Sequence, residues 1–155
     1  MTDKAPCRLG VLVSGGGTNL QAIIDAIEAD EINAVICCVI SNKADAYALT
    51  RARKHGIPVV LHENRDFADR HEYDAVTVEI LRRHNVQLVI LAGFMRILSE
   101  TMVNAFPDAI MNIHPALLPA FPGLHAQRQA LEYGVRFTGC TVHFVDEGLD
   151  TGPII

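Results

Sequence analysis

The tripeptide Asn112-Ile113-His114 has the residue types and the spacing of a small catalytic pair. It ends an apolar run, starting at Ala109, that predicts a strand over residues 109–114. Side chains at i and i+2 of a strand share a face, so Asn112 and His114 should project together. An amide donor beside an imidazole can stabilise an oxyanion and move a proton. The same side chains could instead be satisfied by loop carbonyls, so the pair alone leaves a catalytic and a structural role open.

Asp150 is the candidate carboxylate for this pair. It precedes Thr151-Gly152 in a turn-rich stretch, where local backbone hydrogen bonds commonly fix an aspartate. If Asp150 lies near His114, its negative charge favours the imidazolium form and orients the ring. The spacing along the chain does not show whether the two side chains meet.

A glycine-rich segment, Ser14-Gly15-Gly16-Gly17-Thr18-Asn19, joins the first predicted strand to the first predicted helix. Glycines allow a ligand to approach the backbone closely, and the free N–H groups of a helix start favour a phosphate. The segment is not a dinucleotide fingerprint, because Leu20 stands where the third glycine should be and no acidic residue ends the second strand. It is not a P-loop, because no Gly-Lys-Ser/Thr follows. We predict a site for one phosphate monoester, with an unliganded tight turn as the alternative.

These groups are carried by alternating strand and helix patterns. Strands are predicted at 9–14, 35–40, 58–61, 87–92, 109–114 and 138–145, and helices from about residue 18, at 45–55, at 67–84, after Ser99 and at 125–133. Thr18 and Gln21 have capping-box spacing, and Ser99 is predicted to cap the short fourth helix. The alternation predicts an α/β fold, Rossmann-like, with an open and mainly parallel sheet and helices on both faces. One domain should span residues 1–155, and Gly152–Ile155 should open a further strand.

Composition excludes several classes of protein. Lys and Arg number 13 against 18 Asp and Glu, and the net charge of −5 disfavours binding to nucleic acid by charge alone. The apolar runs are too short to cross a membrane, and the first residues lack the apolar core of a secretory signal. The four cysteines form no CxxC pair, and no histidines have the helical spacing of a zinc site. We expect a cytoplasmic protein with no metal and with no nucleic-acid or membrane partner.

The remaining histidines have less specific patterns. Four of them lie at predicted helix ends or on polar faces and should be exposed to solvent: His55, His62, His71 and His84. His143 alternates onto one face of the last predicted strand, which places it either in the core or in a cleft.

Five segments, in unbroken order, resemble the phosphoribosylglycinamide formyltransferases. They are Ser14–Gln21, Ala92–Leu98, Met111–Pro119, Phe121–His125 and Leu149–Pro153. Asn-x-His followed by Leu-Asp-x-Gly is shared by the wider group of folate-dependent formyltransferases. The glycine-rich loop and the Phe-Pro-Gly-Leu-His stretch are typical of the purine enzymes among them.

The resemblance implies a reaction and a set of residues. The formyl group of 10-formyltetrahydrofolate, a co-substrate, would pass to the amine of glycinamide ribonucleotide in purine biosynthesis, through a tetrahedral intermediate. The implied catalytic residues are Asn112, His114 and Asp150, with Asp150 acting on His114. The implied binding residues are Gly17, Thr18 and Asn19 for the substrate phosphate, and Arg70, Met95, Arg96, Ile97, Leu98 and Asn112 for folate, with Arg70 meeting its acidic tail.

The resemblance also leaves alternatives. Members of the family continue beyond the Gly-Pro-Ile-Ile segment, so we expect the C-terminal end of the formyltransferase domain to be truncated here. A non-catalytic fragment that binds folate and phosphoribosyl groups is one alternative, and a formyltetrahydrofolate deformylase is another. A nicotinamide dehydrogenase is disfavoured by the broken fingerprint, and formyl transfer to tRNA by the negative charge. We expect small-molecule partners and a monomer or weak homodimer.

Overall fold

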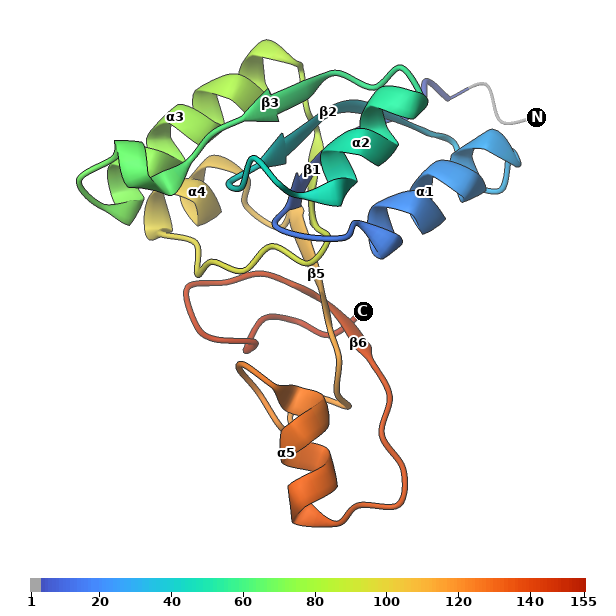
Figure 1. Ribbon diagram of the computed structural model, residues 1–155, viewed down its shortest axis with the longest axis vertical. Coiled ribbons are helices and arrows are strands. Elements are labelled where there is room, and N and C mark those ends of the chain that lie inside the picture. Colours follow the sequence, from blue (N-terminus) through green and yellow to red (C-terminus); the bar gives the residue numbers. More distant parts are fainter. Residues whose placement is uncertain (1–3) are drawn as a thin grey trace.

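A six-stranded sheet, in the order β3-β2-β1-β4-β5-β6, forms the centre of the computed structural model, which describes residues 4–155 (Figure 1). Its strands are β1 (Cys7–Val13), β2 (Ala34–Ser41), β3 (Val59–Leu61), β4 (Leu88–Leu91), β5 (Ile110–His114) and β6 (Thr141–Phe144). The first five strands pair in parallel, whereas β6 pairs with β5 in the antiparallel direction. The predicted mainly parallel sheet is confirmed.

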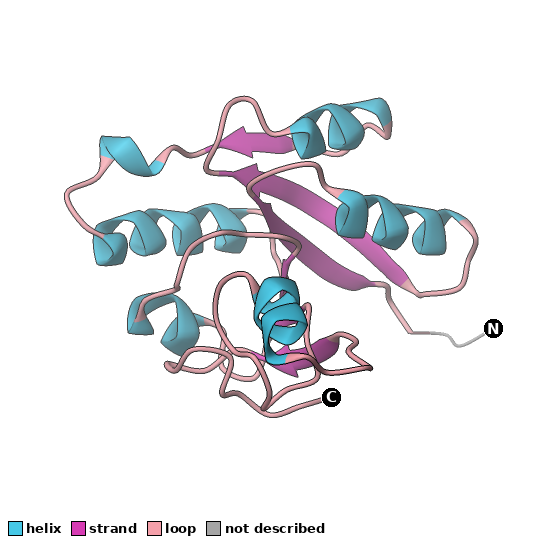
Figure 2. Ribbon diagram, turned by 60° about the horizontal axis from the view of Figure 1, so that its bottom comes forward, coloured by secondary structure: helices cyan, strands magenta, loops and turns pink. Residues whose placement is uncertain are grey.

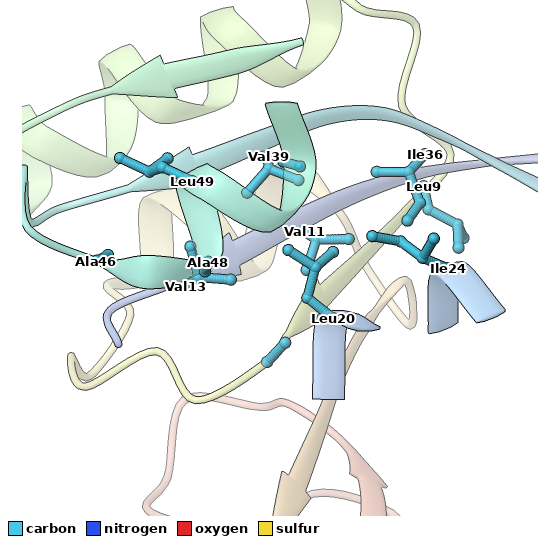
Figure 3. Packing of buried hydrophobic residues seen from close by; sticks show 12 residues of the cluster. Leu9, Val11, Val13, Leu20, Ile24, Ile36, Val39, Ala46, Ala48 and Leu49 are labelled. Carbon is cyan, nitrogen blue, oxygen red and sulfur yellow. The ribbon is translucent and has the colours of Figure 1, made fainter. Parts of the chain in front are cut away.

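Helices cover both faces of the sheet (Figure 2). They are α1 (Thr18–Glu28), α2 (Tyr47–Lys54), α3 (Arg70–Arg83), α4 (Glu100–Ala105) and α5 (Ala126–Tyr133), with a short 3₁₀ helix η1 (Asn64–Asp66). Successive side chains of β1 point to opposite faces of the sheet, so the core consists of two apolar clusters. Val11 packs with α1 and α2 in one cluster, and Leu12 packs with α3 and α4 in the other. Figure 3 shows the first of these two apolar clusters, in which Leu20 and Ile24 of α1 lie against β1. None of the described helices has the length and apolar character that crossing a membrane requires.

The segment between β5 and β6, residues 115–140, projects from the sheet and carries α5 at its far end (Figure 1). We call it the arm. Thr141 fixes the base of the arm, because its hydroxyl donates to the carbonyl oxygen of Ala116 at 2.7 Å and accepts the N–H of Leu118 at 2.9 Å. The arm therefore enters and leaves the sheet at the C-terminal end of β5.

One predicted helix cap, Thr18, is wrong, and the other, Ser99, holds the N-cap position without the capping hydrogen bond. The N-cap of α1 is Gly17 in a left-handed conformation, at φ 71°, and no side chain caps this helix. Thr18 is already the first helical residue, one position too late for a capping box. Ser99 is the N-cap of α4, but its hydroxyl donates to the buried carboxylate of Asp74 at 2.7 Å instead of accepting from the helix. Both helices nevertheless begin where the sequence predicted.

The last predicted strands are shorter than the pattern suggested. β6 spans four residues, Thr141–Phe144, and leaves Cys140 outside the sheet. Beyond Asp150, Ile154 forms a single antiparallel bridge with His143. This bridge returns the chain to β6, so that the loop between them passes the C-terminal end of β5.

Candidate active site

Asn112 and His114 stand at the C-terminal end of β5, the edge where open α/β sheets commonly bind ligands. His114 is only 4% exposed. The sheet register sets Asn112 directly opposite His143 of β6. The strand pairing therefore presents one amide and two imidazoles at the same edge.

Asp150 reaches this edge from the loop after β6. Its Oδ2 lies 3.3 Å from Nδ1 of His114 and accepts the N–H of Gly123 at 2.7 Å. Asp150 adopts a left-handed backbone conformation, at φ 55°, which is unusual for a residue other than glycine. The structure thus brings together the two side chains whose meeting the sequence left undetermined.

Both ring nitrogens of His114 face oxygen acceptors. Nε2 lies 2.8 Å from the carbonyl oxygen of Phe121 in the arm, while Nδ1 faces the Asp150 carboxylate. A neutral imidazole has one N–H and can serve only one such acceptor. The Phe121 carbonyl and the Asp150 carboxylate therefore hold the His114 ring from both of its nitrogens.

His143 is the site residue that sequence reasoning did not find. It is 2% exposed, and its Nε2 lies 3.2 Å from Nδ2 of Asn112 and 3.6 Å from Oδ1 of Asp150. Its Nδ1 faces the carbonyl oxygen of Phe144 at 2.8 Å. Nε2 of His143 can accept a hydrogen bond from the Asn112 amide when it carries no proton. With a proton on Nε2, the same atom points its N–H toward Asp150. The only signal in the sequence was the polar Thr141/His143 face of the last strand, which did not distinguish core from cleft.

The glycine-rich segment lies beside this edge. Thr18 and Asn19 are exposed in the first turn of α1, and the left-handed Gly17 precedes them. Glycine is required at 17, because a Cβ there would lie 2.6 Å from the Cβ of Ala48. A cavity of about 300 Å³ is lined by both Asn19 and Asn112. One residue of the predicted phosphate loop and one of the predicted catalytic group thus line the same cavity, whose other lining residues are apolar.

Four of the six residues predicted to hold folate line one cavity, and the other two do not. Arg96, Ile97 and Leu98 line a cavity of about 80 Å³ together with Asn112. Met95 does not line it: its side chain is 71% exposed, while its N–H donates to the Ser14 hydroxyl at 2.9 Å. Arg70 is the exposed first residue of α3 and does not line this cavity either.

The 95–98 segment contacts a buried aromatic stack through the side chain of Arg96. The guanidinium of Arg96 lies 4.6 Å from the ring centroid of Tyr73, and the Tyr73 ring stacks on His62 at 4.2 Å. Burial raises the pKa of Tyr73 to about 12, against the opposing effect of the Arg96 charge. The predicted exposure of His62 is wrong, because its ring lies between Phe67 and Tyr73 and is only 8% exposed. Within residues 4–155, no three His, Cys, Asp or Glu side chains are placed to hold a metal.

Comparison with known proteins finds relatives along almost the whole chain. The sequence profile of the formyl transferase family matches residues 7–155. The chain is 48% identical to the phosphoribosylglycinamide formyltransferase of Escherichia coli, over 94% of this chain and 68% of that protein. It is 52% identical to the trifunctional purine biosynthetic protein adenosine-3 of Drosophila melanogaster, of which it spans 12%.

Solved structures give the same result for the fold. The crystal structure of glycinamide ribonucleotide transformylase 1 from Symbiobacterium toebii superimposes with a TM-score of 0.97 at 52% identity, covering 99% of this chain and 72% of that one. The phosphoribosylglycinamide formyltransferase of Bacillus halodurans superimposes with a TM-score of 0.93 at 41% identity, covering 96% and 76%. The predicted resemblance is confirmed, and the chain belongs to the formyl transferase family.

Proposed function

We propose that the protein transfers the formyl group of 10-formyltetrahydrofolate to the amine of glycinamide ribonucleotide in purine biosynthesis. The observation that carries the proposal is the group formed by Asn112, His114 and Asp150, with Asp150 Oδ2 3.3 Å from His114 Nδ1. The group lies at the C-terminal end of β5, in a fold shared with solved structures of phosphoribosylglycinamide formyltransferases. The activity and substrates are proposed for the whole protein, because the chain spans 12% of its trifunctional relatives.

The shared cavity supports an assignment of the two ends of the substrate. Gly17, Thr18 and Asn19 would receive the phosphate at the N-terminus of α1, where free amides and the helix dipole favour an anion. Asn19 and Asn112 line the same cavity of about 300 Å³. In this proposal the substrate phosphate binds at the loop and its amine lies near Asn112.

Folate would enter from the side of the 95–98 segment. Arg96, Ile97, Leu98 and Asn112 share a second cavity, so Asn112 stands between the two binding regions. In this proposal Met95 contributes through its main chain, which is fixed by the Ser14 hydroxyl. Arg70, exposed at the start of α3, would bind the acidic tail of the co-substrate.

The reaction forms one C–N bond and breaks another. The substrate amine attacks the formyl carbon, and the carbonyl oxygen becomes negatively charged. The Asn112 amide and Nε2–H of His114 donate to this oxygen, which would replace the Phe121 carbonyl oxygen as the acceptor of the Nε2 hydrogen. The bond from the formyl carbon to N10 of folate then breaks. The proton lost by the amine reaches N10, while Asp150 orients the His114 ring during the transfer.

A formyl-transfer assay on the full-length protein tests the proposal. Formylated product and tetrahydrofolate should appear in equal amounts, and only when both substrates are present. A deformylase would release formate without the amine, and a binding protein would saturate with both ligands without turnover. Asn19→Ala should raise the KM for the phosphoribosyl substrate, whereas a change confined to the folate KM would contradict the proposed phosphate site.

The proposal extends to the setting in which the protein acts. We propose that it works in the cytoplasm on small molecules, without nucleic acid or membrane, as a monomer or weak homodimer. Size-exclusion chromatography over a range of protein concentrations tests the oligomeric state.

A further inference from the structure

The glycine-rich segment is attached to α2 through its carbonyl oxygens. The carbonyl of Gly15 accepts the N–H of Ala48 at 3.0 Å, and the carbonyl of Gly16 accepts Nε–H of Arg51 at 2.9 Å. Two consecutive peptide groups of the segment are therefore fixed from the same side, one by the backbone of α2 and one by a side chain.

These two hydrogen bonds set the direction of the neighbouring amides. In a trans peptide the C=O and the following N–H point in opposite directions. Holding the oxygens of Gly15 and Gly16 on α2 turns the N–H groups of Gly16 and Gly17 away from that helix. Among the described residues, no acceptor takes the N–H of either glycine, and a Cβ at Gly16 would meet no atom within 4 Å. The two amides thus have no acceptor within the described residues and can donate to an anion.

Arg51 is itself held in place. Its Nη1 donates to Oε1 of Gln21 in α1 at 3.2 Å, and its guanidinium lies 5.0 Å from the ring centroid of Tyr47. The Gln21 amide is fixed in turn by Asp25, to which it donates at 2.8 Å. Arg51 therefore ties the glycine-rich segment to both α1 and α2.

The charge of Arg51 is not neutralised locally. Within the described part of the chain, no carboxylate forms an ion pair with Arg51, although it is only partly exposed. A positive charge next to a loop with unpaired amides raises the affinity of that loop for an anion.

We propose that Arg51 is a positioning residue for the substrate phosphate. By holding the Gly16 carbonyl, it keeps the amides of Gly16 and Gly17 directed toward the phosphate before the substrate binds. The inference rests on the proposed function, since it concerns the same phosphate loop. This proposal gives α2 a role in substrate binding, although none of the site residues predicted from the sequence lies in α2.

Two substitutions separate the hydrogen bond from the charge. In Arg51→Gln, the side-chain amide nitrogen occupies about the place of the arginine Nε and can still donate to Gly16, but the charge is lost. Arg51→Met fills similar space and removes both the donor and the charge. Arg53→Met, at an exposed arginine of the same helix, serves as the matched control.

Steady-state kinetics of the full-length protein give the readout. Arg51→Met should raise the KM for the phosphoribosyl substrate about tenfold, as expected when a hydrogen bond from a charged group is lost. The kcat and the KM for folate should stay within about twofold, and Arg51→Gln should recover most of the lost affinity. Arg53→Met should match the parent, and thermal unfolding of each variant checks that the fold is retained.

The outcomes distinguish this inference from the proposed function. If Arg51→Met leaves the phosphoribosyl KM unchanged while Asn19→Ala raises it, the role of Arg51 is overturned and the proposed function stands. If Arg51→Gln is as impaired as Arg51→Met, charge alone acts and the positioning role is overturned. If the parent neither transfers formyl groups nor binds the phosphoribosyl substrate in calorimetry, the proposed function fails and takes this inference with it.

Discussion

Asp150 and His114 meet at 3.3 Å between Oδ2 and Nδ1, although they belong to a loop and a strand that are separated by the whole arm. The same Oδ2 also accepts the N–H of Gly123, so Asp150 fixes the imidazole and the arm together. This carboxylate is the point at which three segments of the chain converge. The most direct tests of the site therefore begin with it.

Asp150→Asn should lower kcat about 10²-fold, in the range expected for a positioned acid–base group. The amide keeps the size of the side chain but removes the negative charge that faces Nδ1 of His114. Both KM values should change by no more than a few-fold. Glu147→Gln, an exposed change in the same loop, is the control. An Asp150→Asn variant as fast as the parent would remove Asp150 from the mechanism.

His143→Leu should lower kcat about tenfold, because it leaves Asn112 and Oδ1 of Asp150 without their shared partner. His143 acts through these two residues, so the effect should fall on kcat more than on either KM. His143→Gln, which restores a polar group at this place, should recover part of the lost rate. Equal kcat values for the Leu variant and the parent would show that His143 is only a core residue.

Gly17→Ala should lower the free energy of unfolding by at least about 1–2 kcal/mol, the cost of placing a residue with a Cβ in the left-handed region. The clash with Ala48 adds to this cost, since the new Cβ would lie 2.6 Å from the Cβ of Ala48. Gly16→Ala is the matched comparison, because a Cβ there meets nothing within 4 Å. Thermal or urea unfolding should therefore separate the two variants, and similar stabilities would refute the assigned role of Gly17.

Tyr73→Leu should raise the KM for folate about fivefold, because it removes the ring on which Arg96 rests. Tyr73→Phe keeps the ring and removes a buried hydroxyl that finds no hydrogen-bond partner within residues 4–155. The Phe variant should therefore retain the folate KM of the parent and be at least as stable. If both variants have the same folate KM, the stack does not support the 95–98 segment.

Burial raises the pKa of the Cys38 thiol from 9.0 to about 12. The folded state therefore holds this proton more tightly than the unfolded chain, so the stabilising contribution is complete below pH 9 and is lost as the pH rises toward 12. The parent should lose about 1 kcal/mol between pH 9 and 10 through this group alone. Cys38→Ala should flatten that part of the curve. Parallel curves from denaturant unfolding would contradict the assignment.

Local patterns in the sequence were sufficient for the order of the elements. Alternation and helical periodicity depend on residues a few positions apart, so they located each strand and helix to within a few residues. The same local information failed at Thr18, because the path of the chain into α1 makes Gly17 the N-cap. At Ser99 it located the N-cap but not the hydrogen bond, because the Ser99 hydroxyl donates to the buried Asp74.

The sequence by itself determined the α/β order of the chain, the pairing of Asn112 with His114 on one strand, and the glycine-rich turn before α1. Only the tertiary structure decided that Asp150 reaches His114, that His143 joins them, and that Arg51 holds the glycine-rich segment. The physical reason is distance along the chain. These contacts depend on the register of β5 with β6 and on the packing of α2 against the loop, and no local pattern encodes either of them.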